Sequence, residues 1–82
     1  MKLTSRNRNI IDVGSVFQTD KDHQYEVINI WDAQNKKYIW VTLKCVKAPK
    51  DSWMLGRVVY GVPLSEWYGV EVINERFEEI KL

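Results

Sequence analysis

The nine residues from Tyr38 to Val46 constrain the fold of this chain more than any other stretch. They contain no Gly, Pro, Asn or Asp and are rich in the β-branched and aromatic residues that favour strands. Side chains of a strand point alternately to its two faces. One face is wholly apolar: Ile39, Val41, Leu43 and Cys45. The other mixes aromatic, hydroxyl and cationic groups: Tyr38, Trp40, Thr42 and Lys44. This pattern predicts a central, half-buried antiparallel strand.

A chain of 82 residues forms one domain and has no room for a second core. A domain of this size buries only about 60% of its unfolded surface, so large side chains must fill the core. Four Trp, four Tyr and two Phe supply them. The single cysteine, Cys45, excludes an internal disulfide and is expected to be a small buried hydrophobe.

Targeting and membrane signals are absent from the residue pattern. The first residues are charged but are followed by no apolar run, so no signal peptide is expected. No stretch approaches the roughly 20 apolar residues that a membrane-spanning helix needs. We therefore expect a soluble, cytoplasmic protein that does not engage a membrane.

The net charge of +1 gives little reason to expect a nucleic-acid partner. Its distribution is uneven. Residues 1–61 hold ten Lys or Arg and six Asp or Glu, whereas residues 62–82 hold two and five. The first segment therefore carries +4 and the second −3, an asymmetry found both in polyanion-binding proteins and in ordinary solvated surfaces.

Hydrophobic alternation and turn residues divide the chain into short elements. Residues 1–12 are polar and are expected to form a flexible N-terminal arm, with a single domain over 13–82. Strands are predicted at 13–19, 24–31, 38–46, 53–60 and 70–73. Residues 64–69 fit either a helical turn or an edge segment. Residues 74–82 fit a helix capped by Asn74 or a terminal strand.

Several short strands with frequent turn signals indicate a mainly β fold. We expect a small SH3-like barrel or sandwich of four to six antiparallel strands, ending in a short helix or strand. The segments Gly14-Ser15-Val16-Phe17-Gln18-Thr19 and Tyr25-Glu26-Val27-Ile28-Asn29 carry a further signal. Over roughly residues 13–60 the chain resembles small phage-encoded SH3-like barrel proteins. That resemblance implies a non-enzymatic binding module, and it transfers no functional residue.

The residues available for catalysis or metal binding are few. The single histidine, His23, lies in a predicted turn, and Cys45 lies on the predicted core face, so a Cys–His pair is not expected. Zinc needs more His and Cys than the chain holds. A calcium loop that began at Asp20 would have Tyr25 where Gly is needed and Trp31 where Glu is needed. We expect no enzyme activity, no metal and no cofactor.

Exposed aromatic and cationic side chains are the best functional signal. Trp, Tyr and Arg are the usual anchors of protein interfaces, and rings flanked by cations bind single-stranded nucleic acid. The candidate binding residues are Lys36, Lys37, Tyr38, Trp40, Lys44, Trp53, Arg57 and Trp67. The alternative is a purely structural role, in which these rings form a second layer of a small core.

We expect a host protein as the partner, which the chain binds and modulates, and single-stranded nucleic acid is the alternative. Self-association into a homodimer stays open.

Overall fold

Five strands form the framework of the computed structural model. It describes residues 1–33 and 38–73, and the side chains of 32, 33 and 38 lie outside that description. The strands are β1 (Val16–Asp20), β2 (His23–Ala33), β3 (Tyr38–Lys47), β4 (Val58–Pro63) and β5 (Glu71–Ile73). Two 3-10 turns accompany them, η1 (Arg8–Ile10) and η2 (Leu64–Trp67).

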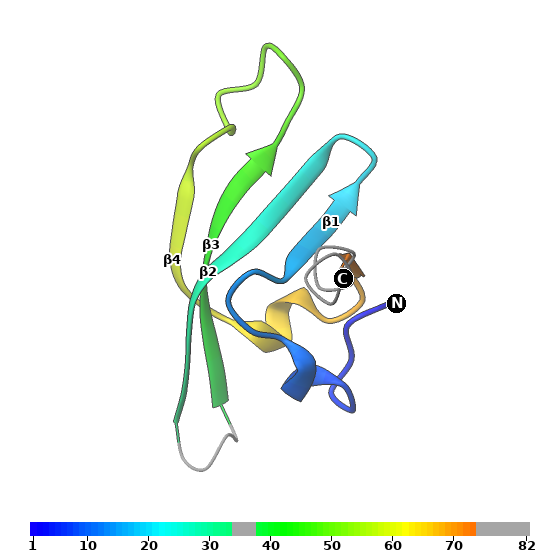
Figure 1. The fold of residues 1–82 in the computed structure, drawn as a ribbon, viewed down its shortest axis with the longest axis vertical. Coiled ribbons are helices and arrows are strands. Elements are labelled where there is room, and N and C mark those ends of the chain that lie inside the picture. The colour runs from blue at the N-terminus through cyan, green and yellow to red at the C-terminus, as the bar shows by residue number, and fades with distance from the viewer. Residues whose placement is uncertain (34–37, 74–82) are drawn as a thin grey trace, which may run out of the picture.

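The strands form one antiparallel sheet in the order β4-β3-β2-β1-β5 (Figure 1). The prediction of a small, mainly β domain with four to six antiparallel strands is therefore confirmed. The sheet is strongly twisted, and β3 passes behind β2 in Figure 1. The helix or strand predicted for 74–82 lies outside the described residues. Among those described, no helical segment has the length and apolarity that a membrane crossing requires.

The core lies on one side of the sheet and is lined by the predicted apolar face of β3. Val41, Leu43 and Cys45 are buried, and Ile39 is half-buried against them. Strands β2, β1 and β5, the N-terminal segment and η2 complete the core: Leu3, Ile11, Phe17, Tyr25, Val27, Leu64 and Val72. The alternation of the sequence thus identifies the inward face of the central strand correctly.

On the opposite face of β3, the alternating pattern predicts that Thr42 is exposed. The structure differs at this residue, because Thr42 is only 5% exposed. Two bulges meet beside this residue. On β2, Val27 pairs with Leu43 and Asn29 with Thr42, so that Ile28 is an extra residue. On β4, Val62 pairs with Val41 and Val59 with Leu43, so that two residues lie opposite Thr42. Bulges bend a sheet and increase its twist, and here they enclose a side chain that a regular strand would expose.

The N-terminal residues are part of the fold, unlike the flexible arm that the polar sequence predicts. Leu3 has no exposed surface, and its N–H donates to the carbonyl of Val70 at 2.9 Å. Gly69 N–H donates to Leu3 O at 2.8 Å, and Val72 N–H donates to Met1 O at 2.7 Å. The apolar side chain and these backbone bonds tie residues 1–3 alongside β5.

The fourth strand begins later than the sequence predicts. Residues 53–57 belong to the loop between β3 and β4, and the strand runs through Gly61 to Pro63. The physical reason lies at Gly56, whose φ of +84° is incompatible with a regular strand. Arg57 N–H donates to Met54 O at 2.9 Å, which closes a turn just before the strand.

Candidate functional site

The predicted binding residues are dispersed over the molecule. Lys36, Lys37 and the side chain of Tyr38 lie outside the described residues. The other five occupy three different environments. Trp67 packs against the core, Trp40 and Lys44 lie on β3, and Trp53 and Arg57 lie in the β3–β4 loop.

Trp67 is a structural side chain. It lies on η2, is half-buried and packs against the core. Its ring centroid lies 5.7 Å from that of Phe17 and 5.5 Å from that of Tyr25, the latter in an edge-on arrangement. These distances are typical of stabilising aromatic pairs. Trp67 therefore fixes η2 onto the sheet.

Trp40 and Lys44 are the described members of the aromatic and cationic face predicted for β3, and they differ in exposure. Trp40 is half-buried, and Thr42 between them is enclosed by the two bulges. Lys44 is exposed but lies opposite Glu26 of β2 in the strand register. A carboxylate directly across the strands lowers the positive potential that a phosphate would meet.

Trp53 and Arg57 are brought together in the β3–β4 loop. Trp53 is 70% exposed, and the guanidinium carbon of Arg57 lies 4.8 Å from its ring centroid. This is the geometry of a cation–π contact. Leu55, 58% exposed, lies between them in sequence. We call Trp53, Leu55 and Arg57 the loop patch.

The loop that carries this patch is held by its own hydrogen bonds. Gly56 N–H donates to Cys45 O, and Cys45 N–H donates to Arg57 O, both at 2.9 Å. Ser52 N–H donates to Pro49 O at 2.9 Å, and Ser52 Oγ accepts the N–H of Met54 at 3.0 Å. Met54 packs against the core. An ordered backbone reduces the entropy that the loop would lose on binding a partner.

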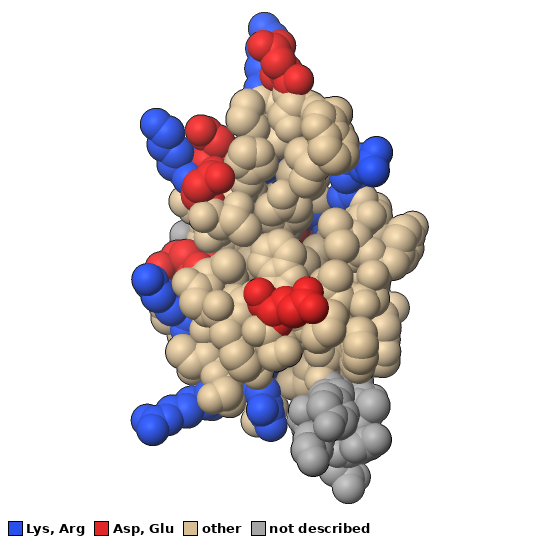
Figure 2. All heavy atoms as spheres, turned by 180° about the vertical axis from the view of Figure 1, so that it is seen from behind, with Lys and Arg blue, Asp and Glu red and all other residues tan. Residues whose placement is uncertain are grey.

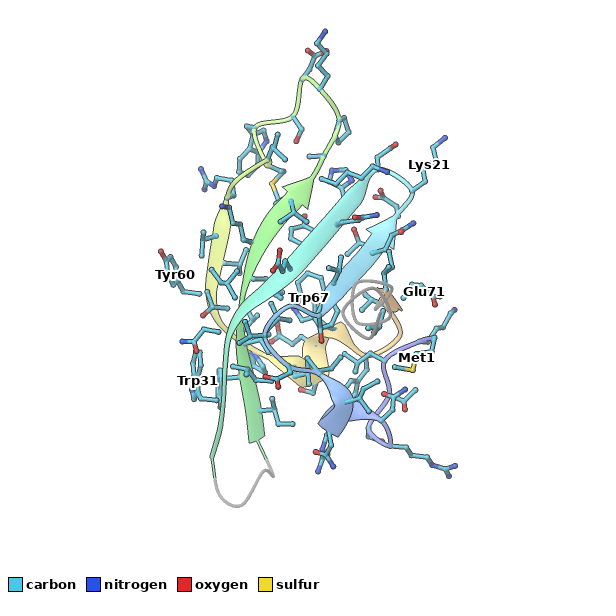
Figure 3. The ribbon with its side chains drawn as sticks, in the orientation of Figure 1. Met1, Lys21, Trp31, Tyr60, Trp67 and Glu71 are labelled. Carbon is cyan, nitrogen blue, oxygen red and sulfur yellow. The ribbon has the colours of Figure 1, made fainter. Side chains whose placement is uncertain are left out.

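Trp31 and Tyr60 are exposed rings that the sequence did not single out. They are 42% and 79% exposed and project outward on the same side of the molecule, whereas Trp67 lies inside (Figure 3). A Cβ added at Gly61, which follows Tyr60, would lie 3.9 Å from the Trp31 ring. We call Trp31 and Tyr60 the strand patch. The sequence signal that could have identified them is Gly61, because a glycine inside a strand often marks a bulge or a place where another group approaches the backbone closely.

Charged side chains are not gathered into a single patch on the face shown in Figure 2. Lys and Arg side chains stand apart from one another at its margins, and several lie next to Asp or Glu. Lys47 is engaged locally, since its Nζ donates to Lys21 O at 3.3 Å. This distribution gives phosphate groups no continuous track on that face.

The residues considered for catalysis make local contacts. His23 Nδ1 lies 3.0 Å from Asp20 Oδ1 in the β1–β2 turn, and that turn was predicted from its composition. This hydrogen bond, followed by one from Asp22 N–H, lowers the pKa of Asp20. Cys45 is buried, and its Sγ donates to Lys47 O at 3.4 Å. Within residues 1–33 and 38–73, no three His, Cys, Asp or Glu side chains come together as a metal site would require.

Comparison of the chain with protein-family models, with curated proteins and with solved structures finds no match.

Proposed function

We propose that this chain is a non-enzymatic binding protein that holds a partner protein through the loop patch. One observation carries the proposal. Trp53 is largely exposed, and the guanidinium carbon of Arg57 lies 4.8 Å from its ring centroid. An exposed Trp side chain presents a large apolar area to water. Burial of this area against a partner would be favourable, because it removes apolar surface from water.

The composition and order of the loop patch support the same function. Trp and Arg are the residue types most enriched among the anchors of protein interfaces. The hydrogen bonds around Ser52, Met54 and Gly56 present both side chains from a preformed loop. A preformed loop loses little entropy on binding, so more of the contact energy is available for affinity.

The nature of the partner rests on the resemblance to small phage-encoded SH3-like barrels. It supports a phage-like protein that binds and modulates a host protein in the cytoplasm. That part of the proposal depends on the sequence pattern of residues 13–60. The loop patch provides the side chains that would contact the partner.

Capture from a bacterial lysate tests the proposal. The wild-type chain, Trp53→Ala and Lys50→Ala would be immobilised, and the retained proteins compared by mass spectrometry. Lys50 is an exposed residue of the same loop and serves as the matched control. We expect one protein to be retained by wild type and Lys50→Ala and lost from Trp53→Ala. Retention by all three chains alike would contradict a role for the loop patch.

Single-stranded nucleic acid is the second candidate, because an exposed ring beside a guanidinium is also suited to stacking a base. A labelled oligonucleotide titrated at about 50 and about 200 mM salt distinguishes the two, since phosphate contacts weaken steeply over this range. The placement of Lys44 opposite Glu26 favours the protein partner. Salt-sensitive binding that is lost in Trp53→Ala would favour nucleic acid instead.

A further inference from the structure

The two edges of the sheet differ in how they are covered. Along β5, Val72 N–H donates to Met1 O at 2.7 Å and Lys2 pairs with Glu71, so the N-terminal residues lie on that edge. β4 ends the sheet on the other side, and β3 is its one partner strand among the residues that the structure describes (Figure 1). Such an edge presents backbone N–H and C=O groups that can pair with a further strand.

The free edge of β4 is regular over residues 58–60. Cys45 N–H donates to Arg57 O at 2.9 Å, which makes this a hydrogen-bonded position at the start of the β3–β4 ladder. Hydrogen-bonded and non-bonded positions alternate in an antiparallel ladder, so Val58 and Tyr60 turn their backbone groups away from β3. Further along, the bulge at Gly61 and then Pro63, which has no N–H, interrupt the edge.

This edge lacks the charged side chains, above all lysines, that commonly protect an edge strand from pairing. The six residues of β4 are Val, Val, Tyr, Gly, Val and Pro. Tyr60 is 79% exposed and projects outward from the strand on the same side as Trp31 (Figure 3). The edge therefore combines unpaired backbone groups with an exposed aromatic ring, and no charge opposes a strand that pairs with it.

We propose that the β4 edge pairs with the β4 edge of a second copy of this chain, antiparallel about a two-fold axis. With the axis at Val59, Val58 of each copy lies opposite Tyr60 of the other. Both residues turn their backbone groups outward, as a hydrogen-bonded pair requires. An aromatic side chain opposite a β-branched one is a favourable cross-strand pair, and the two-fold symmetry forms this pair twice.

The charges of the chain favour a second copy as the occupant of this edge. Because no residue of β4 is charged, pairing of two such strands brings no like charges together. The net charge of +1 adds little repulsion between two whole molecules. A strand of another protein would find no charged side chain on this edge to recognise, whereas the two-fold register makes the edge its own complement. Since the regular edge is short, the dimer is weak and depends on concentration.

Sedimentation equilibrium and hydrogen exchange test this inference on the full chain. Sedimentation between about 10 µM and about 1 mM, a range that covers weak affinities, should show a monomer–dimer equilibrium. Over the same range, the amide protons of Val58 and Tyr60 should exchange more slowly as the dimer forms, because the proposed register bonds them. The amide of Val59 faces β3 and should exchange slowly at every concentration.

Two lysine variants locate the contact. Tyr60→Lys should weaken the dimer about tenfold or more, because both cross-strand pairs lose their ring and each gains a cation. Ile28→Lys adds the same charge at an exposed residue of β2, a strand that is paired on both sides. This matched control should dimerise as the wild type does.

Three results would overturn the inference. The first is a chain that stays monomeric up to about 1 mM, which would leave the edge to a strand of another protein. The second is a dimer in which the Val58 and Tyr60 amides exchange as fast as in the monomer. The third is a dimer that Ile28→Lys weakens more than Tyr60→Lys, since the contact would then lie elsewhere. Trp53 lies outside β4, so Trp53→Ala should dimerise as the wild type does, and the outcome is independent of the function proposed for the loop patch.

Discussion

At the scale of single residues, stability depends on the inward side chains of β3. Leu43 has no exposed surface and lies opposite Val27 on one side and Val59 on the other. Leu43→Ala is expected to lower the free energy of unfolding by about 2–5 kcal/mol, through lost burial and the cavity left behind. Denaturant unfolding measures this loss. Val46→Ala, on an exposed residue of the same strand, is the control, and a loss below about 1 kcal/mol for Leu43→Ala would mean that its site is not packed as described.

Asp20 allows a prediction about pH at the same scale. The His23 side chain and then the Asp22 N–H hold the pKa of Asp20 below its ordinary value. Because the pKa of Asp20 is lowered, the contact stabilises the fold at pH values above the ordinary pKa of aspartate. This contribution is lost as the pH falls through the lowered pKa of the folded state. We expect the carboxyl carbon of Asp20 to titrate below the range of an ordinary aspartate, and its pKa to rise in His23→Ala. An unchanged titration in that variant would exclude the contact as the cause.

At the scale of elements, the two bulges around Thr42 bend the central strands. Gly61 lies in one of them with φ of +60°, and its N–H donates to Thr42 Oγ1 at 3.4 Å. Gly61→Ala is expected to cost about 1–2 kcal/mol of folding stability, because other residues disfavour this left-handed conformation. The new Cβ would make only ordinary contact with Trp31, so the cost comes from the backbone.

The substitution Gly61→Asn separates backbone strain from crowding. Asn adopts positive φ more readily than Ala, so this variant should lose less stability in thermal unfolding despite its larger side chain. A greater loss for Asn than for Ala would show that space, and not conformation, limits position 61.

The sequence predicts most of these elements because alternation identifies a buried face. It places Val41, Leu43 and Cys45 correctly, together with the turn at 20–23 and the short strand at 70–73. Bulges are different. One inserted residue reverses the face of every residue after it, and Ile28 carries no residue-type signal of a bulge. The burial of Thr42 therefore follows from the register alone.

The candidate site was predictable only in part, for a related reason. Trp53 and Arg57 were selected by residue type, but their contact depends on the turn at Gly56, which takes both out of the strand. Trp67 was selected by the same rule but is half-buried against the core, since composition does not tell a packed ring from a free one.

At the scale of the whole molecule, the first residues complete the fold by lying against β5. Figure 3 shows Met1 beside Glu71. The N-terminal ammonium group of Met1 forms an ion pair with the Glu71 carboxylate, and this contact lowers the pKa of Glu71. The buried Leu3 should matter most in this segment. Leu3→Ala is expected to cost about 2–5 kcal/mol of stability in denaturant unfolding. Lys2→Ala, on its exposed neighbour, should change stability by no more than about 0.5 kcal/mol. Equal, small effects would mean that the segment does not pack in solution.

The central claim is that a partner protein is held by the loop patch, and the affinity of the captured partner for Trp53→Ala tests it most directly. Isothermal titration of wild type and Trp53→Ala at about 50 and about 200 mM salt gives both the loss and its salt dependence. We predict that Trp53→Ala weakens binding by about 2 kcal/mol or more, as at an interface anchor, and that wild-type affinity changes little with salt. A loss below about 0.5 kcal/mol in a folded variant would contradict the claim.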